Sequence, residues 1–284
     1  MQSKREKFLA AAQALGCLQC VVCGEPLTRQ GDDFACARGH RVNVNRRGCM
    51  NLLSRAVDGC YDAELFEARQ RVLRSGCYLP VADAMDSMLT GLRPDAAHRL
   101  LDAGCGEGWY LSELLSRHEG WQGAGVDISR DAILRATNQR CTALWCVADL
   151  RRLPFADASF TCVLDVLTPA AYQEFGRVLT EDGVLIKVYP GEKYLQELRL
   201  ARGVALYEEG KVDAYLRKHG TVLRQTRVTV TQPVTPALWR DFVYMTPLNQ
   251  NLDAKEKQAL ASCPSAKVTI DLHVAAAVLN CHSI

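Results

Sequence analysis

Apolar runs of strand length alternate with amphipathic stretches through the second half of the chain. The apolar runs lie at 99–104, 123–128, 143–149, 160–167 and 183–189. Stretches with a helical period lie between them, at 108–117, 131–140 and 170–180. Such alternation indicates parallel strands joined by crossover helices. The sequence therefore predicts an α/β domain with a Rossmann-like, doubly wound sheet.

The pattern changes after residue 191. Residues 192–210 have the apolar spacing of a helix, whereas 227–235 and 267–279 are rich in β-branched residues. A further helix is expected at 236–244, between these two β-rich runs. We expect the two runs to pair as an antiparallel hairpin that closes the sheet, which is the layout of class I methyltransferases.

The first third of the chain divides into three shorter regions. Residues 1–19 form an N-terminal extension, 20–57 hold a Cys/His cluster, and 58–95 form a helical linker with a helical period over 61–92. The α/β domain over 96–284, for which the methyltransferase layout is expected, completes the division. The extension begins like a lipoprotein export signal. Its apolar stretch is short for such a signal and contains the polar Gln13, so we expect an additional N-terminal helix instead. We expect no membrane span, because no run approaches the length of one.

Composition limits the choice of partners and compartment. The 284 residues include 48% hydrophobic and 23% charged residues, which is ordinary for a soluble protein. With a net charge of only +2 the chain lacks a strongly basic surface, so any contact with RNA or DNA must depend on a local cluster. That cluster comprises Arg38, Arg41, Arg46, Arg47 and Arg55. The odd number of cysteines, 13, favours reduced thiols and a cytoplasmic location.

A glycine turn follows the first predicted strand of the domain. Gly104 and Gly106 lie in a G-x-G-x-G pattern between an apolar run and a helix, where backbone amides can face a cofactor. Dinucleotide binders carry the longer G-x-G-x-x-G turn. S-adenosylmethionine has no phosphate, and its cationic sulfonium and amino acid end suit a tighter turn with an acidic rim. Asp102 and Glu107 supply that rim.

Two further acids end the next two predicted strands. Asp127 follows the glycines by about 20 residues, where a carboxylate accepts hydrogen bonds from ribose hydroxyls. Asp149 and the adjoining Leu150 end the third strand, where they are candidates to contact the adenine group. A turn acid is the competing interpretation of Asp149. The ordered set of one turn and two strand-end acids predicts a site for S-adenosylmethionine.

Ahead of this domain, Cys20, Cys23, Cys36 and His40 have the spacing of two zinc knuckles. Thiolate and imidazole ligands suit tetrahedral Zn²⁺, and four protein ligands make the ion structural rather than catalytic. Cys17 lies close enough in sequence to compete as a ligand. Metal binding would order this weakly apolar region and hold the arginine cluster as an arm for a polyanion, unless the cluster is only a solvated loop.

These motifs together resemble the bacterial 23S rRNA (guanine-N1)-methyltransferases. The similarity runs through CxxC…CxxGH, ARQRVLRSGCYLPVADAM, LDAGCGEGWY, GVDISRDAI, LPFADASF, PGEKYLQELR and YMTPL, and covers nearly the whole chain after residue 19. The resemblance implies methyl transfer to N1 of a guanine in a 23S rRNA hairpin by a homodimer. It also implies cofactor contacts at Tyr78, Gly106 and Glu107, and at Tyr194, where family members often have histidine.

The catalytic chemistry is less specified by the sequence. The segment after the fourth strand, VLDVLTPAA, lacks the Asn/Asp-Pro-Pro-aromatic motif of exocyclic-amine methyltransferases, which favours a ring nitrogen as acceptor. Asp165 in that segment is the candidate base for the N1 proton, or else a strand-end acid that supports the loop. Two alternatives stay open. One is a methyltransferase acting on a small molecule, with the zinc module as a lid or dimer element; the other is a non-catalytic RNA-binding or redox-sensing protein with a vestigial cofactor fold.

Overall fold

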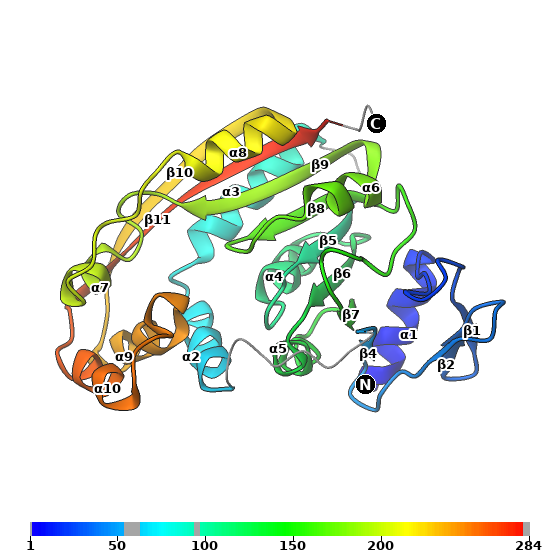
Figure 1. The fold of residues 1–284 in the computed structure, drawn as a ribbon, viewed down its shortest axis with the longest axis horizontal. Helices are drawn as coiled ribbons and strands as arrows, with labels where there is room; N and C mark the ends of the chain where they lie inside the picture. Colours follow the sequence, from blue (N-terminus) through cyan, green and yellow to red (C-terminus); the bar gives the residue numbers. More distant parts are fainter. Residues whose placement is uncertain (1, 54–62, 94–96, 281–284) are drawn as a thin grey trace.

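One eight-stranded sheet runs through the centre of the molecule (Figure 1). The computed structural model describes residues 2–53, 63–93 and 97–280. The strands of this sheet are β4 (Met50–Asn51), β5 (Arg99–Ala103), β6 (Gln122–Asp127), β7 (Leu144–Val147), β8 (Phe160–Val166), β9 (Leu179–Pro190), β10 (Gly220–Pro233) and β11 (Lys267–Leu279). Their order is β10-β11-β9-β8-β5-β6-β7-β4.

The pairing of these strands confirms the predicted fold class. Neighbours from β9 to β4 are parallel, while β11 is antiparallel to both β9 and β10. The chain passes from β9 to the outer strand β10 before β11 inserts between them. The closing hairpin expected at 227–235 and 267–279 is therefore present, and each of the five predicted parallel strands is found.

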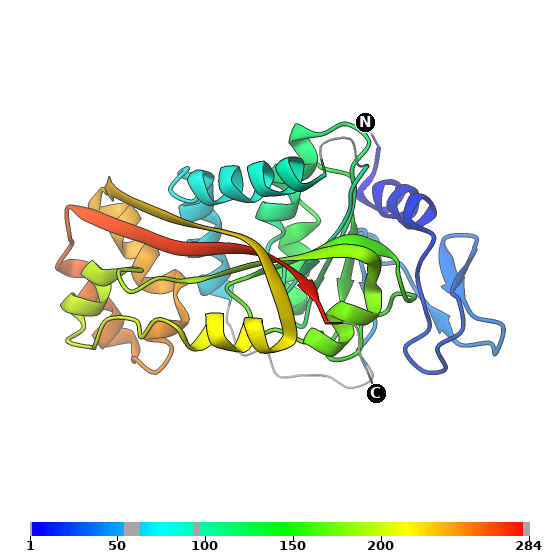
Figure 2. The same ribbon diagram turned by 90° about the horizontal axis from the view of Figure 1, so that it is seen from above.

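Helices cover both faces of the sheet. The helices of the described chain are α1 (Lys4–Leu15), α2 (Ala63–Arg74), α3 (Leu79–Leu92), α4 (Trp109–Arg117), α5 (Arg130–Ala136), α6 (Tyr172–Val178), α7 (Gln196–Ala201), α8 (Lys211–His219), α9 (Pro236–Met245), the 3₁₀ helix η1 (Pro247–Asn249) and α10 (Ala254–Ser262). One apolar core contains side chains of α3, α4 and α5, and the other contains side chains of α1, α6 and α8. Figure 2 shows α3 and α8 on opposite sides of the sheet. Among the described residues, no helix is long and apolar enough to span a membrane.

The N-terminal region is built onto the main sheet. α1 begins at a capping box of Ser3 and Glu6, and it buries Phe8 and Leu15 against the sheet, so the helix expected in the extension is present. The strands β1 (Thr28–Gln30), β2 (Asp33–Ala35) and β3 (Arg41–Val42) form a small antiparallel sheet. β4 then pairs in parallel with β7 at the edge of the main sheet, which the sequence did not indicate.

The helix expected over 192–210 is wrong for most of its length. Only α7 is helical there, and residues 204–209 form an irregular segment. Leu195 has a left-handed φ of 51°, and Gly203 has a φ of 69°, so the helix is bounded on both sides. α8 and α10 form instead in segments for which we predicted no helix.

Candidate cofactor site and metal centre

The glycine turn lies between β5 and α4. Gly104 donates a backbone hydrogen bond to the carbonyl of Val126 (2.8 Å), and its φ of 75° is in the left-handed region. A Cβ at this position would lie 2.6 Å from Oγ1 of Thr168, in the loop after β8. The turn thus requires glycine both for its backbone conformation and for its contact with this loop.

Asp127 is fixed beside the turn at the end of β6. Its carboxylate accepts hydrogen bonds from the backbone N–H groups of Gly106 (2.9 Å) and Ser129 (2.8 Å). Burial raises the pKa of Asp127, although these two donors act in the opposite direction. The carboxylate therefore has a set orientation at the position predicted to bind ribose.

A cavity of about 310 Å³ opens beside these residues. It lies where the carboxyl ends of β5, β6 and β8 meet α2, α9 and the segment after β9. Six of the predicted cofactor residues line it: Tyr78, Asp102, Gly104, Glu107, Asp127 and Tyr194. The other three predicted cofactor residues, Gly106, Asp149 and Leu150, are not part of its lining.

The cavity wall is acidic and incompletely hydrogen-bonded. Oδ2 of Asp102 and both carboxylate oxygens of Glu107 are buried and have no hydrogen-bond partner among the described residues. Burial raises the pKa of Asp102 to about 8, and the nearby Asp127 and Glu107 add to this effect. The pKa of Glu107 is raised as well, mainly by burial. Such a wall suits a cationic ligand, so these residues fit the sulfonium and ammonium groups of S-adenosylmethionine.

Two tyrosines close the cavity on another side. The hydroxyl groups of Tyr78, at the start of α3, and Tyr194, after β9, are hydrogen-bonded at 2.8 Å. Burial raises the pKa of both phenols, so both stay neutral at physiological pH. Tyrosine at 194 thus joins two elements that are distant in sequence.

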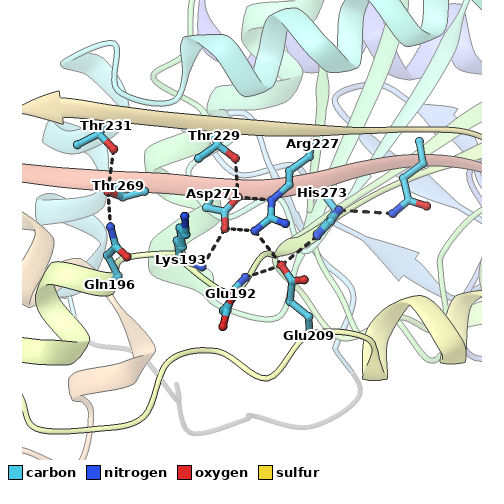
Figure 3. A network of polar contacts seen from close by, with 11 residues as sticks. Glu192, Lys193, Gln196, Glu209, Arg227, Thr229, Thr231, Thr269, Asp271 and His273 are labelled. Atoms are coloured by element: carbon cyan, nitrogen blue, oxygen red, sulfur yellow. Dashed lines mark hydrogen bonds and ion pairs between the residues drawn. The ribbon is translucent and has the colours of Figure 1, made fainter.

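The turn that carries Tyr194 is anchored to the closing hairpin by a polar network (Figure 3). The Asp271 carboxylate accepts hydrogen bonds from Arg227 (2.6 and 2.7 Å), from Oγ1 of Thr229 (2.7 Å) and from the backbone N–H of Lys193 (2.8 Å). Burial alone would raise the pKa of Asp271, but these donors lower it to about 2. The network fixes residues 191–196 and thereby the wall of the cavity.

Two predicted site residues are engaged with neighbouring cations. Asp149 forms an ion pair with Arg151 (2.7 Å), whose hydrogen bonds lower the pKa of Asp149. Asp165 is completely buried and pairs with Lys187 (2.8 Å), which also donates to the carbonyl of Thr168 (2.6 Å). Burial raises the pKa of Asp165 to about 6 in spite of Lys187. Asp165 therefore lies behind the cavity wall and supports the loop after β8.

The predicted metal ligands converge in the N-terminal region. Their ligand atoms all lie within 4.8 Å of one another, in the group Cys20, Cys23, Cys36 and His40. Sγ of Cys36 is 3.6 Å from Sγ of Cys23 and 3.4 Å from Nδ1 of His40. Ligands of a tetrahedral Zn²⁺ at 2.0–2.3 Å stand about 3.3–3.8 Å apart, so this group fits zinc. Cys17 is buried near Arg99 and Ser159 and is not in the group.

The predicted arginine cluster belongs to the same N-terminal region. Arg38, Arg41, Arg46 and Arg47 are exposed, whereas Arg55 lies outside the described residues. Arg38 lies 3.8 Å from a Glu25 carboxylate oxygen, and Arg41 donates a hydrogen bond to Oε1 of Gln30 (3.0 Å). Figure 1 shows this region at the end of the molecule opposite to α7, α9 and α10.

Sequence reasoning missed two arginines that line the cavity. Arg69 lies on α2, and Arg199 lies on α7, where Nε of Arg199 is buried without a partner in the described chain. Arg69 had a detectable signal, because it interrupts the apolar face formed by Phe66 and Val72. A charge in the middle of an apolar stripe indicates a ligand or a buried partner. Arg199 had no comparable signal.

A known family model covers the part of the chain that contains the glycine turn. Residues 100–183 match the family model of a methyltransferase domain. The sheet order and the cavity define a class I S-adenosylmethionine-dependent methyltransferase. A solved structure, the [4+2]-cyclase SpnF, superposes with a TM-score of 0.47 at 17% identity, over 70% of this chain and 82% of that one.

Sequence relatives identify the family. The chain is 32% identical to YxjB of Bacillus subtilis (strain 168), which is named as a 23S rRNA (guanine-N1)-methyltransferase, over 90% of this chain and 95% of that protein. It is 30% identical to the 23S rRNA (guanine(748)-N1)-methyltransferase of Streptomyces fradiae, over 75% of this chain and 79% of that protein. The chain belongs to the family of 23S rRNA (guanine-N1)-methyltransferases.

Proposed function

We propose that this protein transfers a methyl group from S-adenosylmethionine to N1 of a guanine in 23S rRNA. The observation that carries the proposal is the match to relatives of this activity along nearly the entire chain. The match includes both the N-terminal region and the methyltransferase domain. A small-molecule methyltransferase would have no need of an exposed arginine cluster in its N-terminal region.

The cavity residues would hold the cofactor, which supplies an activated methyl group. Asp127 is placed to accept hydrogen bonds from the ribose, and Asp149 and Leu150 are the candidates beside the adenine. Gly104 and Gly106 let the backbone approach the ligand closely. Their support is the fixed orientation of Asp127 and the positive φ angles of the turn.

Orientation of the guanine is the main contribution that the chain's own residues can make. A base held in line with the methyl group reacts without the entropy cost of a bimolecular encounter, which is worth about 7–11 kcal/mol. Asp165 is the candidate that the sequence offers to take the N1 proton, but its carboxylate is buried behind the loop that contains Thr168. We propose that Asp165 and Lys187 position this loop and that the proton leaves to water.

The N-terminal module would bind Zn²⁺ and present the arginine cluster to RNA. The metal-ligand distances support the first part, and the exposure of Arg41, Arg46 and Arg47 supports the second. Figure 1 shows this module at the end of the molecule opposite to α9, whose Met245 lines the cavity, so the proposed RNA substrate would extend between the two. The homodimer implied by the resemblance and a cytoplasmic location, where ribosomal RNA is found, remain parts of this proposal.

Methylation of deproteinised 23S rRNA tests the proposed substrate. Purified protein with radiolabelled S-adenosylmethionine should label full-length 23S rRNA and a transcript of the target hairpin, and should not label 16S rRNA. Transfer to small-molecule acceptors with no transfer to either 23S substrate would favour the alternative function.

A further inference from the structure

The cofactor cavity contains a positive charge that its acidic rim does not explain. Arg69 extends from α2 into the cavity. Its Nη1 atom is 3.3 Å from the position that a Cβ on Gly106 would occupy. The guanidinium group therefore lies over the glycine turn, where the amino acid end of the cofactor is expected.

Arg69 lies among acidic groups but is paired with none of them. Burial would lower the pKa of Arg69, but Glu107, Tyr194 and Asp127 raise it, so the guanidinium stays charged. Within the part of the chain that the structure describes, its side chain makes no ion pair or hydrogen bond. An unpaired charge in a cavity is costly unless a ligand satisfies it.

A guanidinium group and two acidic side chains thus face one cavity with no hydrogen bond or ion pair between them in the described chain. The carboxylate oxygens of Glu107 have no hydrogen-bond partner in the described chain, and the same holds for Oδ2 of Asp102. A ligand that completes both sets must carry a cationic group and an anionic group. The methionine end of S-adenosylmethionine has both, as an α-ammonium and an α-carboxylate.

We infer that Arg69 binds the α-carboxylate of the cofactor, with Glu107 and Asp102 on the side of its cationic groups. A guanidinium fork matches a carboxylate with two parallel hydrogen bonds. The inference rests on the proposed use of S-adenosylmethionine and is independent of the RNA substrate. It assigns to α2 a direct role in binding the cofactor.

Calorimetry with three ligands isolates this contact. The ligands are S-adenosylhomocysteine, its decarboxylated analogue and 5′-methylthioadenosine, which lacks the whole amino acid end. Arg69→Gln should weaken S-adenosylhomocysteine about 10- to 100-fold, as expected for a hydrogen bond between charged groups. Binding of the two ligands without a carboxylate should change by less than about threefold, and Arg69→Lys should restore part of the loss.

The control is Arg74→Gln, which removes an exposed arginine from the same helix. It should leave the affinities for all three ligands unchanged. If Arg69→Gln weakens all three ligands equally, Arg69 only shapes the cavity and the inference is overturned. If S-adenosylhomocysteine binds Arg69→Gln normally, the carboxylate is bound elsewhere. The calorimetry contains no RNA, so its outcome does not depend on whether the proposed rRNA substrate is correct.

Discussion

Asp102 shows how burial sets the chemistry of a single residue in this cavity. Its carboxyl group is shielded from water and lies near two other acids, Asp127 and Glu107, so its pKa is raised to about 8. The ligand-free protein therefore holds a proton on Asp102 at neutral pH. A cationic ligand favours the ionised form, which couples cofactor binding to loss of this proton.

This proton gives a prediction about stability. The unfolded chain releases it near pH 4, whereas the folded chain retains it up to about pH 8. The folded state therefore binds more protons in this window, and its free energy of unfolding falls as the pH rises. Asp102→Asn removes this contribution. Between pH 5 and pH 8 the free energy of unfolding of wild type, measured by urea without ligand, should therefore fall by roughly 3–4 kcal/mol more than that of the variant. Parallel pH dependences would contradict the raised pKa.

A second prediction separates positioning from proton transfer at Asp165. Asp165→Asn leaves Lys187 buried without its counter-ion, so the free energy of unfolding should fall by about 3 kcal/mol. The single-turnover rate with saturating RNA should fall by less than tenfold. The control Asp157→Asn, which breaks an exposed ion pair with Arg177, should change neither quantity by much. If Asp165→Asn is stably folded but its single-turnover rate falls by about 100-fold or more, Asp165 acts as the general base after all.

At the scale of elements, several contacts that build the cavity and its surroundings join segments that are distant in sequence, and short-range sequence patterns do not predict them. The parallel strands and the glycine turn were predictable, because apolar periodicity and turn residues are local signals. β4 was not predictable, since Met50–Asn51 is too short to show a period and forms by pairing with β7. The helix expected over 192–210 is shortened by the anchor at Asp271, which is distant in sequence.

The same distinction applies to the site. The Cys/His group and the strand-end acid Asp127 were predictable from their spacing in the sequence. The role proposed for Arg69 depends on how α2 covers the turn, which only the folded chain defines.

The zinc module should be separable from cofactor binding. Cys36→Ser should reduce bound zinc, measured by mass spectrometry, from about one to near zero per chain, because three ligands hold the ion poorly. RNA affinity should fall by more than about tenfold as the module loses order. Affinity for S-adenosylhomocysteine should change by less than about threefold, since no ligand of the group lines the cavity.

The exposed thiol Cys263 provides the matched control, because Cys263→Ser removes a cysteine remote from the group. It should retain zinc and RNA binding. Protein purified without chelators that contains no zinc, or a Cys36→Ser variant with full RNA affinity, would refute the structural role of the metal.

Over the whole molecule, the net positive charge is small, but exposed positive side chains are concentrated in one region. The chain carries a net charge of only +2, yet exposed arginines gather on the N-terminal module. The cavity is lined by residues of α2, α9 and the segment after β9, and Figure 1 shows α9 at the opposite end of the molecule from this module. In the proposed function, RNA affinity and methyl transfer therefore depend on different regions of the protein.

Salt dependence should show how many RNA phosphates the module neutralises. Replacing Arg41, Arg46 and Arg47 with glutamine should weaken hairpin binding and reduce the slope of log K against log salt by about 0.7–0.9 for each phosphate that is no longer neutralised. Lys218→Gln, which removes a positive charge from α8, should leave the slope unchanged. An unchanged slope in the triple variant would place the RNA on another surface.

The most direct test of the central claim is nucleoside mapping of 23S rRNA by mass spectrometry, with and without the gene. We predict one guanine that carries a methyl group on N1 in cells with the gene and none at that position in cells without it. Re-expression of the wild-type protein should restore the methyl group. Identical 23S rRNA from both strains, or a methyl group on a different atom of the base, would contradict the account.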